Sequence, residues 1–111
     1  MMPAAADLPS GFVLNVYKEI PWTSHDAVSR VRRILGTRQV GHAGSLDPFA
    51  SGVLIVAVGR ATRLVEYLMN HPKRYRGTLV FGRRTSSGDA GGAIVEEGPA
   101  PQVDRGVLEE T

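Results

Sequence analysis

Near the start of the chain, the spacing of apolar side chains changes from the period of a strand to that of a helix. Residues 12–17 alternate in β-prone types, which predicts a short strand. Residues 24–35 carry apolar side chains at helical spacing, which predicts a helix with one buried stripe. That stripe consists of Ala27, Val28, Val31, Ile34 and Leu35. Thr23 or Ser24 is a suitable N-cap, and Gly36 is a natural stop.

The middle of the chain predicts a loop, a buried strand and a second helix. Residues 41–52 contain three glycines and a proline, which interrupt either period, so we expect no regular structure there. Residues 53–58 are apolar throughout, as in a strand that is buried on both faces. Residues 59–70 predict a helix. Its apolar side consists of Ala61, Leu64, Val65 and Leu68.

The last third of the chain is more polar and predicts short elements. Residues 74–81 predict a strand, residues 83–92 a long polar loop, and residues 93–96 another short strand. Residues 103–110 predict the first turns of a further helix. Together with the earlier elements, this order fits a mixed domain of strands and helices.

Length and composition limit the classes of protein that fit. With 111 residues, 42% of them hydrophobic, the chain has room for one domain with a modest core. The longest apolar run is too short for a membrane span and no secretion signal is present, so we expect no membrane partner. The absence of cysteine fits a cytoplasmic protein. His25, His42 and His71 lack ligand spacing, so we expect no metal. Residues 1–10 are predicted to be a flexible leader.

Positive charge is concentrated in the central part of the chain. The formal net charge is only +2, but residues 30–84 hold ten arginines and one lysine against two acids, Asp47 and Glu66. Arginine binds phosphate through bidentate contacts and stacks on bases, so this segment favours a polyanionic partner such as RNA. The alternative interpretation is a solvated basic face.

Asp47 is the most conspicuous residue of this basic segment. It lies in a glycine-punctuated loop close to His42, where positive surroundings favour the ionised carboxylate. The chain has no dinucleotide fingerprint, P-loop or GxSxG elbow, and Glu66 is a poor second carboxylate for glycosidase chemistry. Taken alone, Asp47 could simply start a turn and Tyr75 could simply pack in a strand.

The combination of residues resembles a known family. Residues 41–54, GHAGSLDPFASGVL, resemble the loop written GHxGTLDPxAxGVL in the TruB-type pseudouridine synthases, and we call them the signature loop. Residues 23–25, 59–63, 73–75 and 82–92 resemble the TSH, GxATK/R, KxY and GxxTxTxDxxG segments of that family. The order and spacing agree from about residue 12 to residue 95. Lys18-Glu19-Ile20-Pro21 replaces the usual lysine–proline pair, and Ser45 replaces a threonine.

The resemblance implies that the chain isomerises a uridine in RNA to pseudouridine, without cofactor or metal. The catalytic aspartate would be Asp47, acting by attack on C1′, by proton removal that leads to a glycal, or by attack on C6 of the ring. Tyr75 would be the second catalytic residue, stacking on the uracil and moving a proton. His42 would hold the opened RNA loop after the base has left its stack. The available phosphate contacts are Arg30, Arg32, Arg33, Arg60, Arg63, Arg74, Arg83 and Arg84.

The resemblance also implies a substrate and a fold. The T-loop uridine of the tRNA T-arm is the first expected target, and a guide-RNA system is the second. We expect an α+β pseudouridine-synthase-like fold with a mixed, mainly antiparallel sheet flanked by helices. Because family members are longer, residues 11–111 would be the truncated N-terminal part of the catalytic domain, with exposed strand edges. The alternatives are a non-catalytic RNA-binding module and an inactive fragment.

Overall fold

A computed structural model describes residues 9–110 of the chain. Contacts within the chain divide it into two compact units, the first ending at Lys73 and the second beginning at Arg74. Each unit is described by itself below. The predicted flexible leader, residues 1–10, falls almost entirely outside the described residues.

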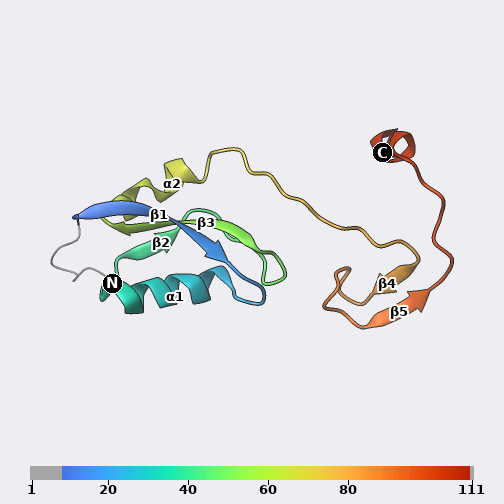
Figure 1. Cartoon of the computed structure of the whole chain (residues 1–111), viewed down its shortest axis with the longest axis horizontal. Coiled ribbons are helices and arrows are strands. Elements are labelled where there is room, and N and C mark those ends of the chain that lie inside the picture. The colour runs from blue at the N-terminus through green and yellow to red at the C-terminus, as the bar shows by residue number, and fades with distance from the viewer. Residues whose placement is uncertain (1–8, 111) are drawn as a thin grey trace. The chain divides into compact units, whose positions relative to one another are not determined.

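The apolar run in the middle of the chain forms the central strand of a three-stranded sheet (Figure 1). This strand, β3 (Gly52–Gly59), lies between β1 (Gly11–Lys18) and β2 (Val40–His42), and it is antiparallel to both. β1 pairs along its whole length, from Gly11 opposite Gly59 to Lys18 opposite Gly52. This sheet is therefore antiparallel throughout, and the predicted α+β fold with a mainly antiparallel sheet and helices is confirmed.

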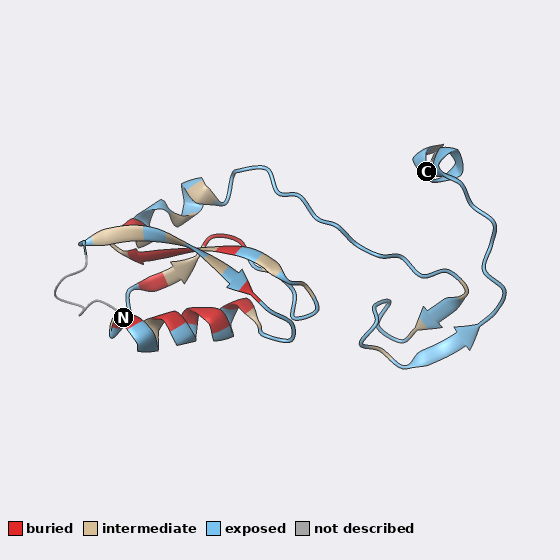
Figure 2. Cartoon of the chain, in the orientation of Figure 1, coloured by how far each residue is buried: buried red, intermediate tan, exposed pale blue. Residues whose placement is uncertain are grey.

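The core of the first unit lies between this sheet and helix α1 (Ser24–Leu35) (Figure 2). The alternation along β1 turns Phe12, Leu14 and Val16 toward the core. The buried cluster consists of Ala27, Val28, Val31, Leu35, Val40, Leu54, Val56 and Val58. The strand prediction for residues 53–58 is only partly correct, because Val53 is 63% exposed while Val56 is fully buried.

Helix α1 has the bounds that its sequence predicts, because the signals at both of its ends are local. Thr23 is the N-cap: its hydroxyl accepts from the Asp26 backbone N–H at 2.9 Å, and the Thr23 N–H donates to the Asp26 carboxylate at 3.0 Å. This is a complete capping box. Gly36, with a φ of 66°, ends the helix in the left-handed conformation that glycine adopts at least cost.

Two predictions in this unit are wrong in detail. The glycine-rich segment is not irregular throughout, since Gly41 and His42 lie in β2 and Gly52 begins β3. Pairing with the long central strand outweighs the weak strand preference of these residues. The second helix begins as a 3₁₀ turn, η2 (Arg60–Leu64), and continues as the short α2 (Val65–Leu68).

The second unit has little buried surface. Strands β4 (Arg83–Thr85) and β5 (Ile94–Glu97) form an antiparallel hairpin, and helix α3 (Arg105–Glu110) follows. The predicted strand at residues 93–96 is confirmed within one residue. The predicted polar loop is wrong at its first three positions, which form β4.

The predicted strand at residues 74–81 is wrong. These residues are exposed and have no regular structure, and no described residue pairs with them. A strand is stabilised by a ladder partner, and an alternating side-chain pattern cannot supply one.

No helix among residues 9–110 combines the length and apolar character needed to cross a membrane.

Candidate functional site

Asp47 lies in the loop of residues 43–51, which connects β2 to β3. Its side chain is exposed, and its backbone oxygen accepts from the Ala50 N–H at 2.9 Å, closing a turn that the Asp47-Pro48 pair begins. Among the described residues, the Asp47 carboxylate has no ion pair or hydrogen bond. The group is therefore accessible to a ligand from solvent.

Ser24 fixes the residue that precedes Asp47. The Ser24 hydroxyl donates to the Leu46 backbone oxygen at 3.1 Å and accepts from the Leu46 N–H at 2.8 Å. Ser24 is also the first residue of α1 and is only 5% exposed. These two hydrogen bonds attach the Asp47 loop to the start of the helix. From the sequence alone, Ser24 was only a candidate cap in a segment that resembles TSH.

Gly44 gives the same loop a second attachment. Its φ of 89° lies in the left-handed region, and the Lys73 side chain occupies the position that a Cβ atom on residue 44 would take. Lys73 Nζ therefore lies over the backbone of the loop that carries Asp47. The sequence singled out Lys73 only as part of a KxY segment, because this approach spans residues far apart in the chain.

His42 lies on β2, paired with Val56 of β3, and is half-buried. Its Nδ1 atom is buried and has no hydrogen-bond partner among the described residues. Buried polar atoms are nearly always satisfied in folded proteins, so this nitrogen is an exception within the described part of the chain.

The arginines of the first unit divide into two groups. Arg32 is half-buried and donates to the Val40 backbone oxygen at 2.9 Å, which ties α1 to β2 and uses part of the guanidinium within the fold. The other predicted phosphate contacts of this unit are exposed and have no ion pair among the described residues. They are Arg30, Arg33, Arg60 and Arg63.

The remaining predicted site residues belong to the second unit. Tyr75 is 68% exposed and Arg74 is exposed. Arg83 pairs with Glu97 at 3.2 Å and Arg84 with Glu96 at 3.4 Å, across the β4–β5 hairpin. Because Asp47 and Tyr75 lie in different units, their pairing in one site stays a prediction.

Asp89 organises the loop between β4 and β5. Its carboxylate accepts from the Ser87 hydroxyl at 2.6 Å and from the Gly91 N–H at 2.9 Å. These hydrogen bonds hold the pKa of Asp89 below its ordinary value, the Ser87 bond being the larger cause. The Thr85 hydroxyl donates to the Asp89 backbone oxygen at 2.7 Å. The hydrogen bonds of Asp89 therefore stabilise the loop in which it lies.

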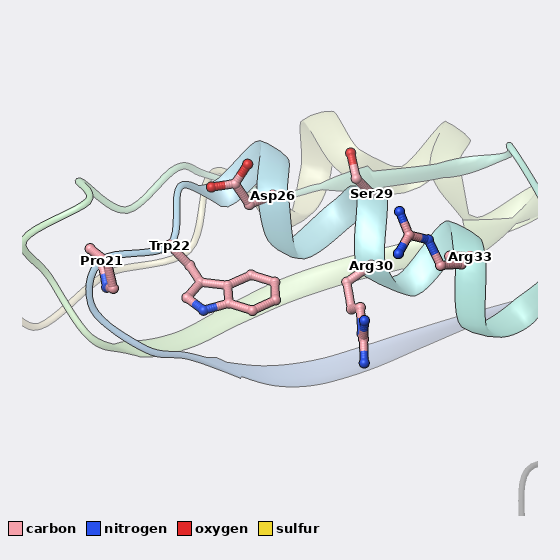
Figure 3. Close-up of a pocket in the computed structure, with 6 residues that line it drawn as sticks. All are labelled: Pro21, Trp22, Asp26, Ser29, Arg30 and Arg33. Carbon is pink, nitrogen blue, oxygen red and sulfur yellow. The ribbon is translucent and has the colours of Figure 1, made fainter.

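A hollow of about 460 Å³ lies along α1 (Figure 3), and Asp47 is not among its lining residues. Its lining residues are Pro21, Trp22, Asp26, Ser29, Arg30 and Arg33. Within residues 9–110, no three side chains of the kinds that ligate metals come together.

Comparisons with known proteins place these features in a family context. The sequence model described as TruB family pseudouridylate synthase (N terminal domain) matches residues 32–111. A tRNA pseudouridine synthase B from Thermobifida fusca is 51% identical over 96 residues, covering 86% of this chain and 33% of the relative. Its counterpart from Caldanaerobacter subterraneus is 54% identical over 89 residues, covering 80% and 31%. The chain thus spans about a third of the length of these relatives.

A solved structure resembles the fold as well. It is described as the structure of an H/ACA RNP bound to a substrate RNA containing 2'-deoxyuridine. The TM-score is 0.50 at 39% sequence identity, and the match covers 57% of this chain and 22% of the other. The sequence comparisons and the structural comparison therefore both find proteins similar to this chain at 39% identity or more.

Proposed function

The chain belongs to the TruB family of pseudouridylate synthases, and from that premise we propose that it takes part in isomerising a uridine in RNA to pseudouridine. The observation that carries the proposal is the Asp47 carboxylate, which is exposed and unpaired among the described residues. The backbone around it is held by Ser24 on one side and by the β2–β3 pairing on the other. A reacting group needs this combination of accessibility and a fixed backbone.

In the proposed reaction, Asp47 acts directly on the flipped uridine. The three routes are attack on C1′, proton removal that gives a glycal, and attack on C6, and each needs an ionised carboxylate. The glycosidic bond to N1 breaks, the uracil turns, and C1′ bonds to C5. The C5 proton is released and N1 takes up a proton, so the product is an isomer of the substrate. The family chemistry uses no cofactor or metal, and every step proposed here uses protein and substrate atoms alone.

The other predicted site residues bind the RNA. Tyr75 stacks on the uracil and moves a proton, and His42 holds the opened RNA loop. The exposed arginines of the first unit contact phosphates directly. Arg83 and Arg84 would exchange their glutamates for phosphates, which costs little because exposed ion pairs contribute at most about 1 kcal/mol.

The substrate we propose is the T-loop uridine of tRNA, in the cytoplasm. The two relatives described above, each at least 51% identical to this chain, are named tRNA pseudouridine synthase B. The guide-RNA system ranks second, since its structural neighbour is 39% identical. A non-catalytic RNA-binding module is the alternative from another functional class.

Mapping of the product tests this proposal. A full tRNA transcript is incubated with the chain, treated with a carbodiimide that marks pseudouridine, and read by reverse transcription. We expect one new stop, at the T-loop uridine, which disappears with Asp47→Asn. Glu66→Gln is the matched control, since Glu66 is the other acid of the basic segment and is exposed on α2.

Three other results would contradict parts of the proposal. A stop that persists in Asp47→Asn would exclude Asp47 as the catalytic group. Stops at other uridines would overturn the T-loop assignment. RNA binding without any stop would favour the non-catalytic module.

A further inference from the structure

We propose that the hollow along α1 is a nucleotide subsite, in which Trp22 stacks on an unpaired base of the bound RNA while Arg30 and Arg33 hold its phosphates. The inference rests on the proposed function in that it takes RNA as the ligand. The subsite is separate from the signature loop, because no residue of residues 41–54 lines the hollow.

The shape and lining of the hollow fit a nucleotide. Its volume of about 460 Å³ falls within the range of small-molecule sites. Trp22, the single tryptophan of the chain, is 41% exposed and lines the hollow together with side chains of α1 (Figure 3). An aromatic face open to solvent beside cationic groups is the arrangement on which unpaired bases stack. Part of Trp22 is therefore covered by the protein and part, about two fifths, is open to solvent and to a base.

Helical periodicity places the polar lining on one side of α1. Asp26, Ser29, Arg30 and Arg33 follow one another at intervals of three, one and three residues, which brings them to the same face. The opposite face carries the apolar stripe that packs on the sheet. The polar side of the helix is therefore presented to solvent as a continuous surface.

The two arginines of this face are free to bind an anion. Neither the Arg30 nor the Arg33 guanidinium has an ion pair or hydrogen bond among the described residues. Asp26, four residues before Arg30, makes no ion pair with either arginine among the described residues, and its carboxylate accepts from the Thr23 N–H at 3.0 Å. The capping box thus keeps the one acid of the hollow occupied and leaves the guanidinium groups available for phosphate.

Hydrogen bonds at its N–H and its backbone oxygen hold the backbone of Trp22, so the ring projects from a defined turn. The Trp22 N–H donates to the Glu19 oxygen at 3.1 Å, and the Trp22 oxygen accepts from the ammonium group of Lys18. Lys18 is itself only 1% exposed, which makes this contact part of the core boundary. A fixed aromatic platform loses little conformational entropy when a base stacks on it.

The hollow is also connected to the proposed catalytic loop. Ser24, two residues after Trp22, makes the two hydrogen bonds to Leu46, immediately before Asp47. A nucleotide held at Trp22 would therefore set the register of the RNA against Asp47 within one unit. The subsite would contribute affinity and position, and take no part in the chemical step.

Fluorescence of the single tryptophan tests the inference. The 111-residue chain is titrated with hexaadenylate and, separately, with inorganic polyphosphate, which carries the charge without bases. We expect saturable quenching with hexaadenylate and none with polyphosphate. Quenching by both would indicate a site for phosphate alone, and quenching by neither would exclude stacking on Trp22; either result overturns the proposal.

Variants then measure how much Trp22, Arg30 and Arg33 each contribute to RNA binding, by the fluorescence anisotropy of fluorescein-labelled hexaadenylate. Trp22→Ala should weaken binding about tenfold, while Trp22→Phe, which keeps a ring, should bind within about threefold of the parent. Arg30→Gln and Arg33→Gln should each lower the slope of log affinity against log salt by about 0.7. Arg38→Gln, an exposed arginine outside the hollow, is the matched control and should leave the affinity for hexaadenylate unchanged.

The outcomes separate this inference from the proposed function. If Asp47-dependent pseudouridine forms while Trp22 emission and the Trp22→Ala affinity stay unchanged, the subsite is wrong and the proposed function stands. If the chain binds no RNA, both are wrong. Trp22→Phe controls for a loss of folding in Trp22→Ala, because it keeps an aromatic ring at the same position. If Trp22→Phe and Trp22→Ala weaken RNA binding to the same extent, stacking on residue 22 is contradicted.

Discussion

At the scale of single residues, the backbone of the Asp47 loop depends on Gly44. Residue 44 has a φ of 89°, and the space next to its Cα is filled by the end of the Lys73 side chain. An alanine there would meet two obstacles, the left-handed backbone and Lys73. Since the Lys73 side chain is flexible, it would move away, and the loop would lose the cation that lies over it.

Gly44→Ala should lower the free energy of unfolding by about 1–2 kcal/mol, the cost of placing an alanine in the left-handed region. It should also weaken RNA binding, because Lys73 is displaced. Gly36→Ala is the control, with a φ of 66° but no atom within 4 Å of the added Cβ. Urea unfolding should show similar losses for both variants, and anisotropy should show weaker RNA binding for Gly44→Ala alone. Unchanged stability in Gly44→Ala would contradict this account.

The residues of the site differ in how far the sequence could identify them. Asp47 stands out because its loop motif is contiguous and specific. Ser24 and Lys73 reach the same loop from positions 22 and 29 residues distant, so their contacts depend on tertiary structure. The paired states of Arg83 and Arg84 likewise depend on the hairpin register, which brings glutamates opposite them. Charge counting alone treats all arginines alike.

At the scale of elements, the N-terminus of α1 is sensitive to acid. Hydrogen bonds from the Thr23 backbone N–H and, next, from its side chain hold the pKa of Asp26 below the ordinary aspartate value. A group whose pKa is lowered by folding stabilises the folded state at pH values above its unfolded pKa. That contribution is lost as the pH falls through the lower, folded value.

Asp26→Asn should therefore destabilise the chain at neutral pH, and the difference from the parent should shrink as the pH falls below the usual aspartate pKa of 3.8. The measurement is the thermal midpoint of the far-ultraviolet dichroism of both chains across this range. Asp89→Asn, on the β4–β5 loop, separates the contribution of the second lowered carboxylate. A difference that is constant with pH would contradict the capping-box account.

The connection between α1 and the catalytic loop gives a second prediction at this scale. Ser24→Ala removes both hydrogen bonds to Leu46 and leaves the backbone N–H and oxygen of Leu46 unsatisfied. This should lower the free energy of unfolding by about 1–3 kcal/mol. Ser29→Ala, on the exposed side of the same helix, should cost less than about 0.5 kcal/mol. Equal losses in chemical denaturation would show that the Ser24 bonds do not hold the loop.

The elements also show why sequence-based prediction succeeds in one place and fails in another. Helix α1 is predicted with its exact bounds because its stripe, cap and terminal glycine are all local signals. Residues 74–81 contain β-prone side chains but have no ladder partner among the described residues. Residues 41–42 show the opposite case: their local strand preference is weak, but they form a strand because they pair with β3. Pairing is a tertiary property that the local pattern does not contain.

At the scale of the whole molecule, the three-stranded sheet keeps two edge strands, β1 and β2, without further partners in the described part of the chain. Val13, Tyr17 and Val53 are exposed on it. Unpaired edges with apolar neighbours favour association between chains. We therefore expect self-association in sedimentation velocity, and a clean monomer with a single cooperative melt would contradict that expectation.

The central claim is that Asp47 carries out chemistry on uridine. The most direct measurement is the release of tritium from 5-tritiated uridine in a tRNA T-arm stem-loop, because C5 must lose its hydrogen when it bonds to C1′. We predict release by the parent chain and by Glu66→Gln, and none by Asp47→Asn. Undiminished release by Asp47→Asn, or no release by a folded parent chain that binds the stem-loop, would contradict the account.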